Sequence, residues 1–205
     1  MSTPIAKAPW PIARSAQATV AAAALAEVCR AVTVRAHRLH PQDTSLSASG
    51  RASMVSTYVM TVAAVLFLVW FSRCRRNAQL LSPEPLPGSA PWAVASWLVP
   101  VVNLWVPRGL VLDLHRASGP GAAEGRDGVL VNVWWAAWVG RAVLVTAGTQ
   151  LGQGTSLVLL LVAEALNLAA GALAIAVIQR VTAQQAAALT TKLPLPGAAD
   201  LPHLA

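Results

Sequence analysis

The sequence predicts an all-α integral membrane protein, a bundle of four transmembrane helices with one additional re-entrant half helix that proline breaks. Hydrophobic residues make up 56% of the 205 residues and charged residues only 11%, whereas soluble globular proteins carry roughly 25% charged residues. Apolar runs long enough to cross a bilayer recur along the chain. The net charge of +7 comes from basic residues that lie between those runs. This placement is typical of membrane proteins, so we expect no binding to nucleic acid.

The first apolar run, Ser15 to Val34, is rich in alanine and contains Glu27 and Arg30. Its Ala24-Leu25-Ala26 stretch resembles a signal-peptide cleavage site. However, alanine gives a poorly hydrophobic core, and a long region with three prolines precedes the run. We therefore expect an uncleaved first helix after a cytoplasmic N-terminus of residues 1–14.

The second run, Met54 to Phe71, has no charged residue in 18 positions and reaches about 27 Å at 1.5 Å per residue. That length is close to the hydrocarbon thickness of a bilayer, so the run is predicted to span the membrane. A basic juxtamembrane end follows it, formed by Arg73, Arg75, Arg76 and Asn77.

Two further runs, Val129 to Ala147 and Thr155 to Ile178, are long enough to span the membrane despite the charges of Arg141 and Glu164 within them. The transmembrane domain is thus expected to cover residues 15–181. Residues 182–205 begin with a helical pattern and then become rich in proline. This composition predicts a cytoplasmic, partly disordered tail.

The segment Trp92 to Val106, called the broken segment below, is only fifteen residues long and has Pro100 in its middle. Because proline removes a helical hydrogen bond, the segment is predicted to form either a re-entrant hairpin or a kinked fifth span. With four spans, ten basic residues lie inside and three outside, whereas the better five-span arrangement gives eight and five. Cytoplasmic loops carry the excess of Lys and Arg, which favours four spans with both termini in the cytoplasm.

The four-span arrangement also places all eight tryptophans in the cytoplasmic half of the membrane or near its midplane. Such a distribution is typical of an aromatic belt at the membrane surface. We expect the membrane to be the plasma membrane of a bacterium.

Four charged residues fall inside the predicted spans, at a similar depth in the outer half of the membrane. They are Glu27, Arg30, Arg141 and Glu164. Charges inside a bilayer are costly and usually pair within the bundle, so we expect one ion-pair network in which Arg141 pairs with Glu164. A role in fixing helix packing is favoured, and a pathway for protons or ions is the alternative.

The broken segment supplies a second candidate site, formed by Pro100, Asn103, Trp105 and Pro107. Broken helices in transporters place freed carbonyl groups around ligands near the membrane midplane. The favoured interpretation is that Asn103 satisfies backbone groups freed by Pro100.

No sequence motif indicates a catalytic site. The HExxH, GxSxG, Walker-loop and GxGxxG patterns are all absent from the sequence. His37, His40 and Asp43 have a spacing that can hold a divalent metal, but a solvated face is the favoured interpretation. We therefore expect no metal, no cofactor and no catalytic residues.

The absence of catalytic motifs favours a non-enzymatic role as a scaffold or regulatory membrane protein. Its expected partners are the lipid bilayer and either a second copy of the chain or another membrane protein. A small transporter or channel that uses the intramembrane charges and the broken segment is the second hypothesis. A membrane enzyme is the third.

An ordered set of tryptophan, asparagine and proline residues runs through the chain. It consists of Trp70-Phe71-Ser72-Arg73, Asn77-Ala78, Trp92-Ala93, Trp97, Pro100-Val101-Val102-Asn103-Leu104-Trp105-Val106-Pro107, Asp113-Leu114-His115-Arg116-Ala117-Ser118 and Trp134-Trp135. This order resembles an uncharacterised bacterial membrane-protein family common in actinobacteria, domain of unknown function 4328 (DUF4328), over about Val55 to Gln185. The chain departs from the family's pattern at Pro91, where the family has Gly, and at His115, where the family has Trp. The resemblance implies a membrane architecture and no particular activity.

Overall fold

The computed structural model describes residues 7–82, 85–118, 125–153 and 156–192, and these residues contain helices and no strand. Four of the helices are long, namely α1 (Trp10–Leu39), α2 (Leu46–Leu81), α5 (Arg126–Gln150) and α6 (Leu157–Lys192). Each of the four is long and apolar enough to cross a membrane. The predicted all-α membrane bundle with four transmembrane helices is confirmed.

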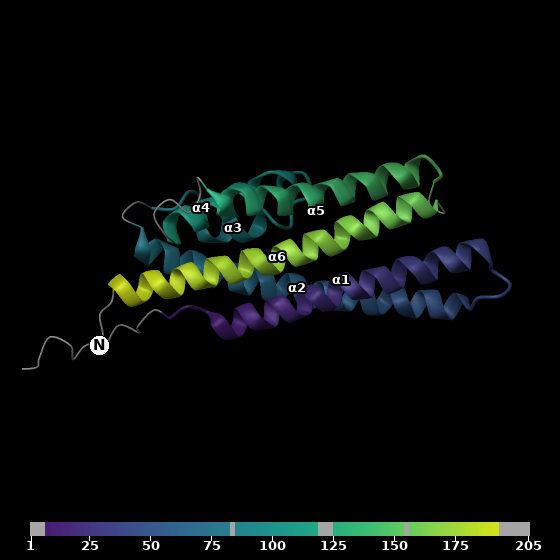
Figure 1. The fold of residues 1–205 in the computed structure, drawn as a ribbon, viewed down its shortest axis with the longest axis horizontal. Helices are drawn as coiled ribbons and strands as arrows, with labels where there is room; N and C mark the ends of the chain where they lie inside the picture. Colours follow the sequence, from purple (N-terminus) through teal and green to yellow (C-terminus); the bar gives the residue numbers. More distant parts are fainter. Residues whose placement is uncertain (1–6, 83–84, 119–124, 154–155, 193–205) are drawn as a thin grey trace, which may run out of the picture.

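The region between α2 and α5 forms short helices in place of a fifth span. It contains α3 (Ala90–Ala95), the 3₁₀ turn η1 (Val102–Leu104) and α4 (Val106–Ser118). The helix is interrupted on both sides of Pro100, as the proline predicts. Figure 1 shows α3 and α4 at the end of the bundle where α2 ends and α5 begins. The chain therefore enters and leaves this region at the same end, as expected for a re-entrant segment.

The packing order of the helices leaves room for this region. Helix α1 packs against α2 and α6, and α5 packs against α6. Helix α4 contacts α2, α5 and α6, whereas the described parts of α2 and α5 make no extensive contact with each other. Helix α4 thus lies between α2 and α5 in the half of the bundle where α1 begins and α6 ends (Figure 1).

Helix α6 is longer than hydropathy predicts. The predicted span ends at Ile178, but the helix continues to Lys192, and Thr182 and Gln185 are completely buried. The indole nitrogen of Trp70 donates a hydrogen bond to Thr182 Oγ1 at 3.0 Å, and Gln185 Nε2 donates to the carbonyl of Cys74 at 2.7 Å. Residues just beyond 181 therefore belong to the packed bundle.

The predicted boundary at the other terminus also shifts, because α1 begins at Trp10, before Ser15, and continues to Leu39. Residues 193–205 of the tail for which partial disorder is predicted lie outside the described residues, as do residues 1–6.

The basic end of α2 does not face solvent as a single group. Arg73 and Arg76 are exposed, but Arg75 is only 4% exposed. Its Nη2 donates to the carbonyl of Gly88 at 2.6 Å and also to that of Pro87. Arg75 thus holds the connector that leads into α3, which three neighbouring arginines in a sequence do not reveal.

Two threonine hydroxyl groups in the span of α2 are satisfied within the helix. Thr57 and Thr61 of α2 each donate to the carbonyl four residues earlier, at 2.9 and 2.8 Å. Such bonds supply partners where a bilayer offers no water. They explain how α2 carries Thr57 and Thr61 through the membrane.

The tryptophans contribute more to the core than an aromatic belt requires. Trp92 and Trp105 are exposed, at 46% and 64%, as residues of a belt are. Trp70, Trp134 and Trp135 are buried inside the bundle. The belt therefore accounts for only part of the eight tryptophans.

The four-span topology predicts which loops share a side of the membrane. In a Cys29→Ser background, which removes the exposed native thiol, we expect Ala90→Cys and Gly125→Cys to react with a membrane-impermeant maleimide from one side of sealed vesicles. Gln153→Cys should react from the other side. All three positions are exposed. Reaction of Ala90→Cys and Gly125→Cys from opposite sides would demonstrate a fifth span.

Candidate functional site

The four charged residues of the spans lie together and are called the charge cluster below. They are Glu27 and Arg30 of α1, Arg141 of α5 and Glu164 of α6. Helix α2 joins the cluster through Ser56, whose hydroxyl donates to Glu27 Oε2 at 2.9 Å. The cluster therefore connects all four transmembrane helices.

Glu27, rather than Glu164, is the centre of the cluster. Arg30 donates to both Glu27 carboxylate oxygens, at 2.7 and 2.6 Å, and Arg141 Nη2 lies 2.6 Å from Glu27 Oε1. The same Arg141 nitrogen is 3.9 Å from Glu164 Oε1. Arg141 does contact Glu164 as the sequence suggests, but its shorter partner is Glu27.

Asn167 extends the cluster along α6 and was not recognised from the sequence. Its Nδ2 donates to Glu164 Oε2 at 3.1 Å and to the carbonyl of Ala24 in α1 at 3.0 Å. An asparagine three residues after a buried glutamate can orient that carboxylate. Only the position of α1 shows that Asn167 also binds across the helix interface.

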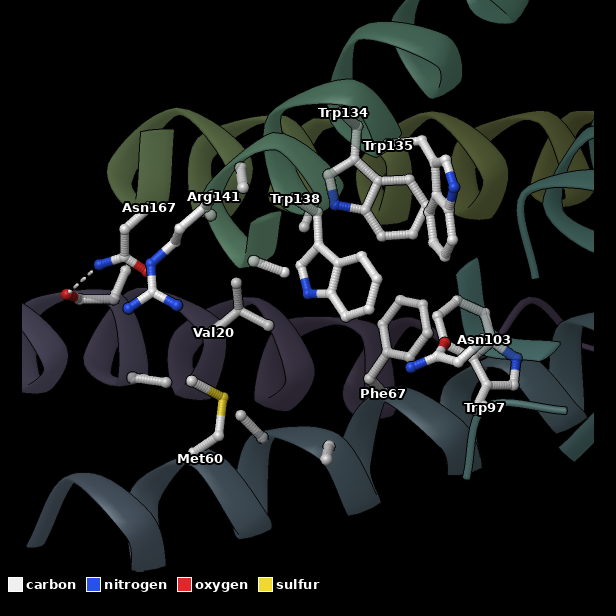
Figure 2. A pocket seen from close by; sticks show the side chains of 18 of the residues that line it. Val20, Met60, Phe67, Trp97, Asn103, Trp134, Trp135, Trp138, Arg141 and Asn167 are labelled. Carbon is white, nitrogen blue, oxygen red and sulfur yellow. Dashed lines mark hydrogen bonds between the residues drawn. The ribbon is translucent and has the colours of Figure 1, made fainter. Parts of the chain in front are cut away.

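A pocket of about 400 Å³ lies beside the charge cluster, bounded by α1, α2, α5, α6 and the broken segment. Small residues of α1 and α6 form one wall, and they are Ala23, Ala24, Ala170, Gly171 and Ala174. Aromatic side chains line the pocket toward the broken segment. They are Phe67, Trp97, Trp134, Trp135 and Trp138. Figure 2 shows Arg141 and Asn167 at one end of this space and Trp97 with Asn103 at the other.

The broken segment is held in place by α5. The indole nitrogen of Trp135 donates to the carbonyl of Leu104 at 3.0 Å, so a tryptophan satisfies a carbonyl group beside the break. The side-chain oxygen of Asn103 is buried without a hydrogen-bond partner, and the residue lines the pocket (Figure 2). A carbonyl group freed by Pro100 needs a donor, which only the side-chain nitrogen of Asn103 supplies, so the unpartnered oxygen does not test the favoured expectation, which stays a prediction.

The other members of the broken-segment site have separate surroundings. Pro107 is fully buried, at the start of α4. Trp105 is exposed, and so is Pro100. The structure thus brings Asn103 to the pocket, but it does not gather all four residues into one site.

A second polar cluster lies where α4, α5 and α6 meet. Gln184 Nε2 donates to Asp127 Oδ2 at 2.6 Å, so its Oε1 faces His115 Nδ1 at 3.0 Å and accepts the proton of that nitrogen. His115 is completely buried, and its Nε2 has no hydrogen-bond partner. Burial lowers the pKa of His115. The hydrogen bond with Gln184 and the charge of Asp127 oppose this effect, whereas the charge of Arg180 lowers the pKa further.

The geometry of the charge cluster predicts unequal effects of neutralising its two carboxylates. Glu27→Gln should lower the apparent melting temperature of the purified protein by roughly 5–10 °C, since it leaves two arginines without their main partner. Glu164→Gln should cause a distinctly smaller loss. The double exchange Arg141→Glu with Glu164→Arg should not restore stability, because it places a second carboxylate beside Glu27. Equal losses for the two single variants would contradict this arrangement.

The lowered pKa of His115 predicts that acid destabilises the protein. Below a pH of about 6.5 the unfolded chain binds a proton at this residue, whereas the folded chain binds it only at lower pH. The free energy of unfolding therefore decreases as the pH is lowered, by up to about 1.4 kcal/mol per pH unit. His115→Gln should reduce the loss of thermal stability between pH 7.5 and pH 5.5. His40→Gln, at an exposed histidine, is the matched control. A loss as large in His115→Gln as in the parent would contradict the assignment.

Comparison with known proteins gives one match. The family model for the domain of unknown function DUF4328 covers residues 35–183, which is well over half of the chain. The matched range includes the broken segment, α5, Arg141 and Glu164, but it begins after Glu27. No curated protein and no solved structure matches the chain. The chain therefore belongs to the family of domain of unknown function DUF4328.

Proposed function

We propose that this protein is a non-enzymatic membrane protein that binds an uncharged, largely apolar molecule in the pocket beside the charge cluster. The observation that carries the proposal is the pocket itself, with its volume of about 400 Å³ and its mainly hydrophobic lining. Pockets that bind small molecules have volumes of roughly 300–1,000 Å³ and are mostly apolar, with a few polar groups.

The position of the opening supports uptake from the bilayer. Met60 of α2 and Leu98 of the broken segment line the pocket and are also exposed, at 44% and 71%. Met60 lies well inside a membrane-spanning helix. An opening at this depth faces lipid, so an apolar molecule reaches the pocket without crossing water.

The chemistry of the lining supports binding over catalysis. Arg141 is the one charged side chain among the residues that line this pocket in the described chain, and it is paired with Glu27. A paired guanidinium is a poor acid or base, and the lining contains no serine, cysteine or histidine. Trp97 and Leu98 line the pocket and belong to the broken segment, and Leu98 is exposed at the surface. A molecule in the pocket therefore contacts a segment that a partner protein can also contact.

A small transporter is the second candidate function. One observation favours it, because the pocket reaches both the broken segment at Asn103 and the charge cluster at Arg141. The apolar lining between these ends argues against an ion as the substrate, since ions require polar groups along their path.

The proposed orientation places both termini in the cytoplasm and the chain in the bacterial plasma membrane, with the bilayer and a second copy or another membrane protein as partners. The distribution of basic residues between the two sides supports this orientation. Maleimide labelling of Ala90→Cys, Gly125→Cys and Gln153→Cys in intact cells tests this orientation, because the impermeant reagent reaches only the outer side of the membrane.

The binding proposal predicts saturable labelling by an uncharged photoreactive chain. Hexadecyl methyl ether with a diazirine in mid-chain should crosslink to the pocket helices of the full-length protein in lipid nanodiscs, and unlabelled ether should compete. Ala170→Leu should reduce this labelling several-fold, because Ala170 lines the pocket. Ala169→Leu, at the exposed neighbouring position, should not. Labelling that does not saturate, or that is equal in both variants, would disprove the proposal.

A further inference from the structure

We infer that the outer surface of the bundle carries a binding site for an anionic phospholipid, whose phosphate group binds to Arg108 of α4 and Asn132 of α5. This site is separate from the pocket and goes beyond the proposed function. It follows from the chemistry of these two side chains and from their depth in the membrane.

Arg108 and Asn132 form an exposed polar pair between two helices. Helix α4 lies beside the first half of α5 (Figure 1), and Arg108 Nε donates a hydrogen bond to Asn132 Oδ1 at 2.8 Å. Both residues are exposed. Gly109, the next residue of α4, has open space where a side chain would lie. No neighbouring element of the described chain therefore covers the first turn of α4 at this point.

The hydrogen bond within this pair leaves mainly donors for a ligand. The single side-chain oxygen of Asn132 already accepts from Arg108 Nε. The amide nitrogen of Asn132 and the two terminal nitrogens of Arg108 are donors only, and they form no hydrogen bond with the described part of the chain. Donors combined with a positive charge select an anionic acceptor, and the planar guanidinium group matches the oxygens of a phosphate.

The positive charge of Arg108 is not neutralised by a carboxylate of the described chain. The aspartates at this end of the bundle pair with other arginines. Asp113 lies 2.9 Å from Arg116, and Asp127 lies 3.6 Å from Arg180. A charge that faces hydrocarbon without a partner is costly. An anion supplied by the membrane removes much of this cost.

The pair lies on the lipid-facing side of α5. Val129, Val133 and Ala136 are exposed and share one face of the helix with Asn132, at positions i, i+4 and i+7 around i+3. Asn132 is six residues before Trp138, the middle residue of α5, which corresponds to about 9 Å along the helix. The hydrocarbon half of a bilayer is about 15 Å thick, so the pair lies just below the headgroups. A long arginine side chain reaches the phosphate groups from this depth.

The surroundings favour a lipid without a cationic headgroup. Arg126 is exposed on the same side of α5, three residues before Val129 and thus closer to the membrane surface. Its charge repels the ammonium group of a zwitterionic phospholipid, whereas the neutral glycerol of phosphatidylglycerol meets no such repulsion. Trp105, three residues before Arg108, is also exposed and is the kind of side chain that packs against lipid at a membrane interface.

The test measures lipid affinity by native mass spectrometry of the full-length protein in detergent. Dioleoyl phosphatidylglycerol and dioleoyl phosphatidylcholine are added in separate titrations of one preparation. We expect the first phosphatidylglycerol molecule to bind roughly fivefold more tightly than phosphatidylcholine, because the ammonium group is repelled near the arginines. Inorganic phosphate at millimolar concentration should not displace the bound lipid.

Three variants locate the site. Arg108→Gln removes the charge, and Asn132→Leu removes the amide without a change of net charge. Each should lower the affinity for phosphatidylglycerol, by roughly 5- to 30-fold for Arg108→Gln and a few-fold for Asn132→Leu, as expected for lost hydrogen bonds to a charged group. Arg116→Gln makes the same change of charge at an exposed position of α4 and should lower the affinity by a factor of about two at most. Circular dichroism melting curves establish that each variant is folded, and Asn132→Leu tests the site even where Arg108→Gln does not fold.

The unfavourable outcomes are distinct from one another. Equal losses in Arg108→Gln and Arg116→Gln, or an unchanged affinity in Asn132→Leu, would indicate attraction by the net charge of the surface and overturn the site. Equal affinity of the parent protein for the two lipids would overturn the choice of an anionic lipid. Displacement by inorganic phosphate would assign the pair to a soluble anion and overturn the lipid assignment.

Discussion

A helix broken inside a membrane must satisfy its open backbone within the protein, and this constraint organises the bundle. The carbonyl of Leu104 is satisfied by the indole of Trp135, which fixes the broken segment against α5. Helix α4 then occupies the space between α2 and α5. Because it fills that space only in one half of the bundle (Figure 1), the other half retains the pocket. The break, the separation of α2 from α5 and the pocket are thus consequences of one requirement.

The charge cluster complements this arrangement in the other half of the bundle. Glu27 accepts hydrogen bonds from Arg30, Arg141 and Ser56, which joins α1 to α5 and α2 where no aromatic core holds them. An ionic connection of this kind fixes geometry more than it adds net stability, because desolvation of the charges offsets their attraction. It also keeps the charges of Glu27 and Arg141 away from the hydrocarbon.

Local features of the sequence were sufficient to predict the spans and the break, because the length of an apolar run and the missing N–H of Pro100 do not depend on distant residues. The members of the charge cluster were also predictable, since their depth follows from their position along each helix. The central role of Glu27 was not, because it depends on α1 lying beside α6 and on how each helix is rotated. The helical start of residues 182–205 was predictable, but the packing of Thr182 and Gln185 into the bundle was not, because both are polar and only their partners Trp70 and Cys74 show that they are buried.

The pocket could not be predicted at all, since it is a space between five segments and not a property of any one of them. It ends at the broken segment on one side and at Arg141 and Asn167, beside the charge cluster, on the other. Between them, the exposed side chains of Met60 and Leu98 border the opening, and flexible methionine and leucine chains are displaced more easily than backbone. Under the proposed function, a ligand enters from the bilayer by moving these side chains, while the ionic and backbone contacts at both ends stay intact. The proposed binding function therefore requires exchange with lipid and no passage across the membrane.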